Sequence, residues 1–513
     1  MDRQSTADLV LFNARIITLD AMRPIAQAVA IRGERILAVG SDPEPWTGPG
    51  TRLMDCQGKT IVPGFNDAHC HILAFVQSLL SLDFSPASVM SINQMQAVLR
   101  KHVQQVPPGS WITTTGYNEF YLAEKRHPTR WDIDEAAPHN PVRILHRSGH
   151  AQVLNSLALS QVGISIDTPE PPGALIDRDI ESGEPDGLLF EMNNWVAEKI
   201  PHLSPAELEK WLTVANKQYL SLGITSLQDA SVHNSPAHWQ LFQSIKANGE
   251  LSPRLTMMLA YKHLDEFLNQ GLAPGQGDSQ LKLGAVKIVL DESSGSLYPP
   301  QQELNEIVLR VHKTGYQVAI HAIDTVDAVA TALEYALVKH PRPHRHRIEH
   351  CSVCPPETLN RLSKLGVIVV TQPPFLYYSG ERYLSEVPKH QLPWLYRIKS
   401  FKEAGLRPAA SSDSPVAPNN PLMGIYAAVT RKTDTGEAIL PEEAISPYDA
   451  LEMYTIAAAY ANFEENGKGS ISPGKLADLV VLNNDPTRVP YEVIKDIKVE
   501  MTIIGGEVAW GGI

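Results

Sequence analysis

One stretch of the sequence decides the fold: Ile61-Val62-Pro63-Gly64-Phe65-Asn66-Asp67-Ala68-His69-Cys70-His71. An apolar run breaks at Pro63-Gly64 and leads to two histidines two residues apart. Side chains at i and i+2 of a strand lie on one face, so the pattern predicts a strand end that presents both imidazoles together. Two neutral imidazoles can bind a divalent metal, but such pairs also occur by chance. A metal site therefore needs support from elsewhere in the chain.

Seven further apolar runs alternate with helical patterns along the chain. They cover residues 223–229, 254–259, 283–290, 316–321, 346–350, 367–372 and 407–413. Near-continuous apolar strands that alternate with helices predict a parallel sheet, and eight of them predict an α/β fold of the (β/α)8 TIM barrel type. The alternative is an open doubly wound sheet, but no Gly-x-Gly-x-x-Gly turn follows any of the runs.

At both ends of the chain, the sequence pattern predicts short strands separated by glycine turns. Isolated hairpins are marginally stable, so the two ends are expected to pair in one small β-sandwich domain formed by residues 1–62 and 466–513. The barrel is expected at 63–465. The interval after its first strand is much longer than one helical crossover requires, which predicts a large inserted subdomain at about 80–215. Pro- and Gly-rich parts of this interval are typical of surface loops.

Composition limits the classes of function. The net charge of −13 argues against a nucleic-acid partner, because phosphate binding needs a basic surface. No targeting segment or membrane-length apolar run is present, and four cysteines do not indicate a disulfide framework. We therefore expect a cytoplasmic enzyme with a small-molecule substrate and no membrane partner. A homodimer is expected only because it is the commonest soluble assembly.

Side chains that can bind metals fall at the ends of the predicted strands. The carboxyl ends of barrel strands meet at one mouth, so these sequence-distant groups are expected to converge there. They are His69 and His71 in strand 1, Lys287 in strand 4, His321 in strand 5, His350 in strand 6 and Asp413 in strand 8. A lysine inside an apolar strand needs an explanation, since a buried ammonium is costly. Either Lys287 pairs with a carboxylate such as Asp291, or it is a neutral amine that captures carbon dioxide; spacing alone does not decide.

This set of residues resembles the amidohydrolase superfamily. The resemblance is carried by residues 63–71 with Lys287, His321, His350 and the sequence Ser412-Asp413-Ser414-Pro415. The pattern Ser148-Gly149-His150 and the terminal segment 469–482 are similar to the YtcJ-like branch, called amidohydrolase family 3, which includes N-substituted formamide deformylases. The resemblance spans nearly the whole chain.

The resemblance implies a centre of two divalent metal ions, with zinc as the default for imidazole and oxygen ligands. His69, His71 and Asp413 would bind one ion, His321 and His350 the other, and a carboxylated Lys287 would bridge them. A metal-bridging hydroxide would attack the substrate, and Asp413 would act as general base and then general acid. The implied reaction is hydrolysis of a non-peptide carbon–nitrogen bond of an amide or formamide.

Substrate contacts are expected from residues outside this ligand set. The resemblance implies that His150 is catalytic and donates to the substrate carbonyl or the oxyanion. Glu191 and Gln372 could line the substrate pocket, and Trp111 and Tyr117 could form its apolar walls, although aromatic residues more often belong to a core. Such walls predict an uncharged aromatic or alkyl amide.

Two other functions remain open. A mononuclear aminohydrolase that deaminates a heterocycle uses similar ligands, but such enzymes have a glutamate three residues after the strand-5 histidine, where this chain has Asp324. Lys287 favours the two-metal amide hydrolase. A non-catalytic scaffold of the same fold is the second alternative, although all six ligand positions carry competent residues. Departures from the branch pattern at Asp324 and at 291–295 prevent transfer of a particular substrate.

Overall fold

The structure is a computed structural model that describes residues 6–171, 173–200, 203–290 and 297–512. Asp291 and the departure at 291–295 lie outside the described residues. The chain divides into two compact units, Met1–Ile72 with Thr213–Ile513, and Leu73–Leu212. In the part of the chain that is described, no helix has the length and apolarity needed to cross a membrane.

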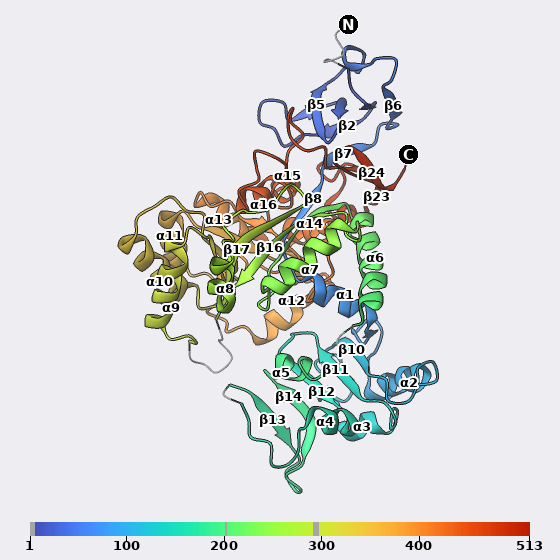
Figure 1. The fold of residues 1–513 in the computed structure, drawn as a ribbon, viewed down its shortest axis with the longest axis vertical. Helices are drawn as coiled ribbons and strands as arrows, with labels where there is room; N and C mark the ends of the chain where they lie inside the picture. Colours follow the sequence, from blue (N-terminus) through green and yellow to red (C-terminus); the bar gives the residue numbers. More distant parts are fainter. Residues whose placement is uncertain (1–5, 172, 201–202, 291–296, 513) are drawn as a thin grey trace. The chain divides into compact units, whose positions relative to one another are not determined.

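Eight parallel strands form the barrel of the first unit (Figure 1). In sheet order they are β8 (Phe65–Cys70), β15 (Ile224–Asp229), β16 (Arg254–Ala260), β17 (Leu281–Val289), β18 (Val318–Ala322), β19 (Arg347–His350), β20 (Ile368–Thr371) and β21 (Ala409–Ala410). The first and last strands are linked by two backbone hydrogen bonds. The amide of Asp413, beyond the end of β21, donates to the carbonyl of His69 in β8 at 2.9 Å, and the amide of His71, just beyond β8, donates to the carbonyl of Ser414 at 2.9 Å. The predicted (β/α)8 fold is confirmed.

Helices follow the barrel strands, and α9 buries one apolar face, on which Leu304, Val308 and Val311 recur at helical spacing. Helices α9 and α10 lie side by side outside the strands (Figure 1). The helices of this unit are α7 (Pro236–Ala247), α8 (Leu264–Asn269), α9 (Gln301–Lys313), α10 (Val326–Lys339), α11 (Pro356–Leu365), α12 (Pro374–Glu386), α13 (Ile398–Glu403), α14 (Pro421–Thr430), α15 (Pro447–Met453) and α16 (Ile456–Ala461). The segment before β15 is α6 (Pro205–Ser221).

The two ends of the chain build two further sheets, as predicted. One has the order β5 (Arg35–Gly40), β4 (Ala28–Arg32), β1 (Leu9–Phe12) and β6 (Arg52–Asp55). The other has the order β24 (Glu507–Gly511), β23 (Val499–Ile504), β22 (Leu479–Leu482), β7 (Thr60–Pro63), β2 (Arg15–Ile17) and β3 (Ile25–Ala26). Both sheets contribute to one apolar core, in which Leu11 and Val29 join Leu479 and Ile503.

The opening stretch is divided between two sheets. Ile61 and Val62 pair with β22 in the terminal sheet, whereas barrel strand β8 begins at Phe65. Gly64 lies between them, and a Cβ atom there would stand 2.1 Å from Oγ1 of Thr225. Only glycine allows the backbone to pass this close to β15 as it leaves one sheet and enters the other.

The second unit contains its own mixed sheet and cores. The sheet order is β13 (Leu175–Arg178), β14 (Pro185–Phe190), β12 (Ala151–Leu154), β11 (Val142–His146), β10 (Ile112–Tyr117) and β9 (Leu82–Asp83). Its helices are α2 (Ile92–His102), α3 (Arg130–Asp134), α4 (Ser156–Val162) and α5 (Asn193–Ala197), and α1 (Ile72–Leu80) begins at the boundary. The unit overlaps the segment of about 80–215 for which the sequence predicts an inserted subdomain.

Candidate metal centre

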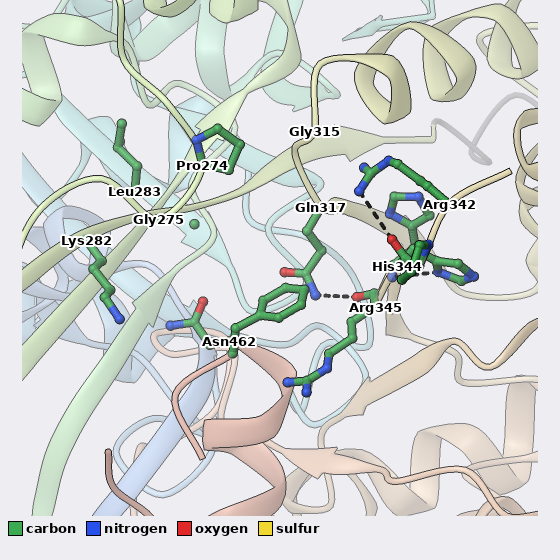
Figure 2. A pocket seen from close by; sticks show the side chains of 14 residues that line it. Pro274, Gly275, Lys282, Leu283, Gly315, Gln317, Arg342, His344, Arg345 and Asn462 are labelled. Atoms are coloured by element: carbon green, nitrogen blue, oxygen red, sulfur yellow. Dashed lines mark hydrogen bonds between the residues drawn. The ribbon is translucent and has the colours of Figure 1, made fainter. Parts of the chain in front are cut away.

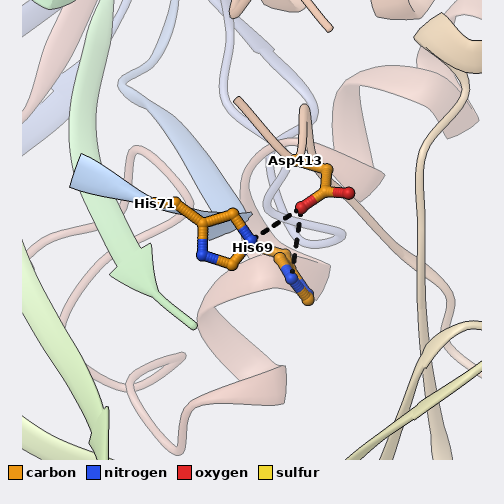
Figure 3. Close-up of side chains that lie close together, drawn as sticks. All are labelled: His69, His71 and Asp413. Carbon is orange, nitrogen blue, oxygen red and sulfur yellow. Dashed lines mark hydrogen bonds and ion pairs between the residues drawn. The ribbon is translucent and has the colours of Figure 1, made fainter. Parts of the chain in front are cut away.

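Three of the predicted ligands meet at the carboxyl end of β8. The carboxylate oxygen Oδ1 of Asp413 lies 3.0 Å from Nε2 of His71 and 3.4 Å from Nε2 of His69 (Figure 3). One ligand atom of each residue lies within 4.8 Å of the others. His69 is in the strand, and His71 directly follows its end at Cys70, so two residues of spacing bring both rings to the same carboxylate. This donor set of two imidazoles and one carboxylate fits a divalent metal.

The other three predicted ligands adjoin this cluster. Nζ of Lys287 lies 3.3 Å from Nε2 of His69. The ring of His350 lies 5.0 Å from that of His69 and 4.4 Å from that of His321, measured between ring centres. All six side chains predicted from the sequence therefore form one connected group at the carboxyl ends of the barrel strands.

Hydrogen bonds orient two of the imidazoles toward the centre of the group. Nδ1 of His69 lies 2.5 Å from Oε2 of Glu349, and Nδ1 of His350 lies 2.8 Å from Oε1 of Gln372. The amide nitrogen of Gln372 donates to Ser411, so its oxygen is the acceptor for His350. Both rings are thus protonated at Nδ1, which leaves Nε2 of each as the nitrogen available to a metal.

Glu349 belongs to a buried ionic network that the sequence analysis missed. Arg347 donates from Nε to Oε1 of Glu349 at 2.5 Å and from a terminal nitrogen to Oε2 at 3.0 Å. Its other donors bond Gln228 at 2.7 Å and the carbonyl of Ala68 at 2.6 Å. Both charged side chains are at most 1% exposed. A signal was present, because Arg347 and Glu349 stand two residues apart in a predicted barrel strand and so share a face.

The loop that carries Asp413 is held by a second carboxylate. Asp67 accepts from the amide of Ser412 at 3.0 Å and from its hydroxyl at 2.5 Å. Asp413 adopts a φ of 57°, a conformation that few non-glycine residues occupy. Strand β21 ends at Ala410, earlier than the predicted run to 413, because the backbone leaves the sheet to place this carboxylate.

The loop after His71 is fixed by the end of β15. Asp229 accepts from the amide of Ile72 at 2.7 Å, and Nδ1 of His71 lies 3.3 Å from the hydroxyl of Ser231. Nε2 of His71 therefore faces Asp413. As in His69 and His350, the second ring nitrogen is engaged by a neighbouring side chain.

Burial sets the protonation of the central groups. It holds the pKa of His69 and of His350 well below the usual range, and nearby positive charge acts in the same direction. Burial also lowers the pKa of Lys287 to about 8, although Glu349 and Asp413 act against this shift. Metal ligation requires neutral imidazoles, and reaction with carbon dioxide requires a neutral amine, so these shifts fit the implied ligand roles.

Of the remaining predicted residues, Gln372 adjoins the six-residue group, and the other four lie in the second unit. Gln372 is fully buried and bonded to His350 and Ser411, as described above. In the second unit, Nδ1 of His150 pairs with Oε1 of Glu191 at 2.8 Å, and the His150 side chain is 63% exposed. Tyr117 lies in the core of that unit with its hydroxyl 3.0 Å from His127, and Trp111 packs against a neighbouring apolar cluster. Substrate roles for these residues stay predictions.

The family of this protein follows from its similarity to known proteins. Residues 52–509 match the model of the amidohydrolase family. The chain belongs to this family.

Known relatives are similar over almost the entire chain. The N-substituted formamide deformylase of Arthrobacter pascens is 30% identical, with 97% of each chain covered. The putative amidohydrolase YtcJ of Bacillus subtilis is 26% identical, with 91% of this chain and 92% of the relative covered. An uncharacterised metal-dependent hydrolase from Pyrococcus furiosus has a similar structure, with a TM-score of 0.73, 26% identity, and coverage of 94% of this chain and 100% of that chain. The predicted YtcJ-like resemblance is confirmed.

Proposed function

We propose that this protein hydrolyses the carbon–nitrogen bond of a small, uncharged amide of the formamide type. One observation carries the proposal: His69, His71 and Asp413 converge in one cluster, with Lys287, His321 and His350 beside them. The similarity to an N-substituted formamide deformylase over 97% of both chains supports a non-peptide substrate.

The residues present fit two divalent ions. His69, His71 and Asp413 would hold one ion, His321 and His350 the other, and Lys287 as a carbamate would be shared between them; zinc suits these donors. When bound, the metals would polarise the substrate carbonyl and supply hydroxide at neutral pH. Glu349 and Gln372 would keep two of the imidazoles in the ligating tautomer.

Asp413 would handle the proton of the reaction. Its Oδ1 faces both imidazoles, and no described residue donates a hydrogen bond to its Oδ2. That oxygen can accept a proton from the attacking water and deliver it to the departing amine nitrogen. The backbone bond from the Asp413 amide to His69 holds the carboxylate at this position.

Apolar side chains around the mouth favour an uncharged substrate. Val289 is two residues beyond Lys287 and therefore on the same strand face, and it is 42% exposed. Ile323 and Val416 follow the ends of β18 and β21 and are 36% and 37% exposed. Exposed aliphatic groups beside charged ligands would gain from contact with an alkyl or aromatic substituent.

A substrate panel tests the proposal. N-formyl amines with alkyl or benzyl substituents are compared with N-acyl amino acids and with amino-heterocycles, on protein whose metal content is measured by elemental mass spectrometry. We expect about two ions per chain and fastest release of amine from the N-formyl amines. Release of ammonia from the heterocycles with one ion per chain would instead establish a deaminase, and absence of turnover on all three classes would favour a scaffold.

A further inference from the structure

A cavity of about 570 Å³ lies at the opposite ends of the strands that carry the candidate metal ligands (Figure 2). Gln317 directly precedes β18, which carries His321, and His346 directly precedes β19, which ends at His350. Four residues of strand span about 13 Å. The cavity therefore opens at the amino-terminal end of the barrel and is separate from the metal centre. Its volume is in the range of small-molecule sites.

Two side-chain amides present their oxygens to this cavity. Gln317 uses its amide nitrogen to donate to two backbone carbonyls. Asn462 uses its nitrogen to donate to Thr256 at 2.5 Å and Glu464 at 2.8 Å. Figure 2 shows both amide oxygens on the cavity side, and no donor to either oxygen is found among the described residues. Each oxygen is thus oriented to accept a hydrogen bond from an N–H or O–H group of a ligand.

Arg342 supplies a positive charge to the cavity wall. Its guanidinium donates to the backbone carbonyls of His312 at 3.0 Å, Tyr316 at 3.0 Å and Pro343 at 3.3 Å. In the described part of the chain no carboxylate forms an ion pair with it, whereas Arg345 beside it pairs with Glu465 at 2.7 Å. The three carbonyls fix the guanidinium and leave two of its five N–H groups for an anion.

Part of the cavity wall is apolar. Phe463 lines the cavity and is 54% exposed, and the guanidinium of Arg345 lies 4.6 Å from the centre of its ring. Pro274 and Leu283 contribute aliphatic surface to the same cavity. An exposed phenyl ring beside aliphatic groups favours a planar aromatic ligand, which can stack on the ring.

We propose that this cavity binds a small aromatic carboxylate that carries an N–H or O–H donor. The carboxylate pairs with Arg342, the ring stacks on Phe463, and the donor bonds the amide oxygens of Gln317 and Asn462. This site is additional to the proposed amide hydrolysis and does not depend on it.

The test is isothermal titration of the full-length protein with three matched compounds. 4-Aminobenzoate has the charge and the donor, benzoate lacks the donor, and 4-aminobenzamide lacks the charge. We expect 4-aminobenzoate to bind with a Kd of about 1 mM or below, and each of the other two to bind about tenfold more weakly. Arg342→Gln and Phe463→Ala should each weaken 4-aminobenzoate about tenfold. Arg488→Gln, an exposed arginine outside the cavity, should leave binding unchanged.

Binding at the metal centre is distinguished by Asp413→Asn, which should not alter the affinity for 4-aminobenzoate. Loss of binding in Asp413→Asn with full binding in Arg342→Gln and Phe463→Ala would place the ligand at the metal centre and overturn the proposal. Equal affinities for all three compounds, or no heat from 4-aminobenzoate, would also overturn it.

Discussion

Replacement of Glu349 by glutamine should lower both the stability of the protein and its affinity for metal, because Glu349 orients the candidate ligand His69 without being a ligand itself. Glu349 accepts from His69 and from two nitrogens of Arg347, and both side chains of this pair are at most 1% exposed. Glutamine keeps the size but has one acceptor oxygen, so Arg347 loses its buried counter-charge. Breaking a buried ion pair from one side costs about 3–5 kcal/mol.

The same substitution should weaken metal binding. Without the carboxylate, Nδ1 of His69 loses the acceptor that keeps its proton there, and the ligating Nε2 tautomer is less favoured. Removing such a partner of a metal-ligating histidine typically lowers metal affinity about 10–100-fold. We expect a loss in this range for Glu349→Gln, measured by competition with a chromogenic chelator.

The matched control is Glu334→Gln. Glu334 also forms a double hydrogen bond with an arginine, Arg361, at 3.0 and 2.8 Å, but the two side chains are 43% and 29% exposed. Exposed pairs contribute about 0–1 kcal/mol, so this variant should unfold close to the wild type and keep its metals. Equal urea midpoints for the two variants, together with unchanged metal affinity of Glu349→Gln, would refute the reasoning.

Three further predictions concern catalysis, specificity and pH. Asp413→Asn should lower kcat for the best formamide by about 10³-fold or more, since general base catalysis is lost; near-native turnover in steady-state assays would exclude Asp413 as the base. Val289→Ser should lower kcat/KM for alkyl-substituted formamides about tenfold at unchanged metal content, because apolar contact with the substituent is removed. The kcat/KM for unsubstituted formamide should be unaffected. Burial acts to raise the pKa of the Glu119 carboxylate, but His146, whose Nε2 lies 2.8 Å from Oε2 of Glu119, outweighs burial and lowers this pKa to about 2. A depressed pKa stabilises the folded state above the unfolded value of about 4.3, and the contribution is lost as pH falls toward 2. Glu119→Gln should therefore flatten the acid side of the stability curve in thermal melts, and an unchanged curve would contradict the assignment.

Much of the fold could be predicted because it depends on local pattern. Most barrel strands belong to short apolar runs between helical segments, and burial on both faces favours that composition. The six candidate ligands could be predicted for a related reason, since parallel strands in a barrel bring their carboxyl ends to one mouth. Lys287 is 218 residues from His69 in the sequence, and Asp413 is further still. In the structure, Nζ of Lys287 lies 3.3 Å and Oδ1 of Asp413 lies 3.4 Å from Nε2 of His69.

Other features depended on contacts between distant segments. The break at Pro63-Gly64 could be read from the local sequence. That its two sides join different sheets, and that Gly64 passes close to Thr225, depended on tertiary contacts. Tyr117 was a candidate for a substrate wall from its side-chain type alone, which does not distinguish a pocket from a core. Its position, fully buried in the core of the second unit, came only from the structure.

By itself, the sequence determined the alternation of strands and helices, the pairing of the two chain ends and the identity of the six candidate ligands, because these follow from periodicity and from residues at strand ends. Only the tertiary structure decided which atoms those ligands present. The Nε2 atoms of His69 and His350 face inward because Glu349 and Gln372 occupy their Nδ1 atoms, and these hydrogen bonds exist only once the separate strands have closed into a barrel.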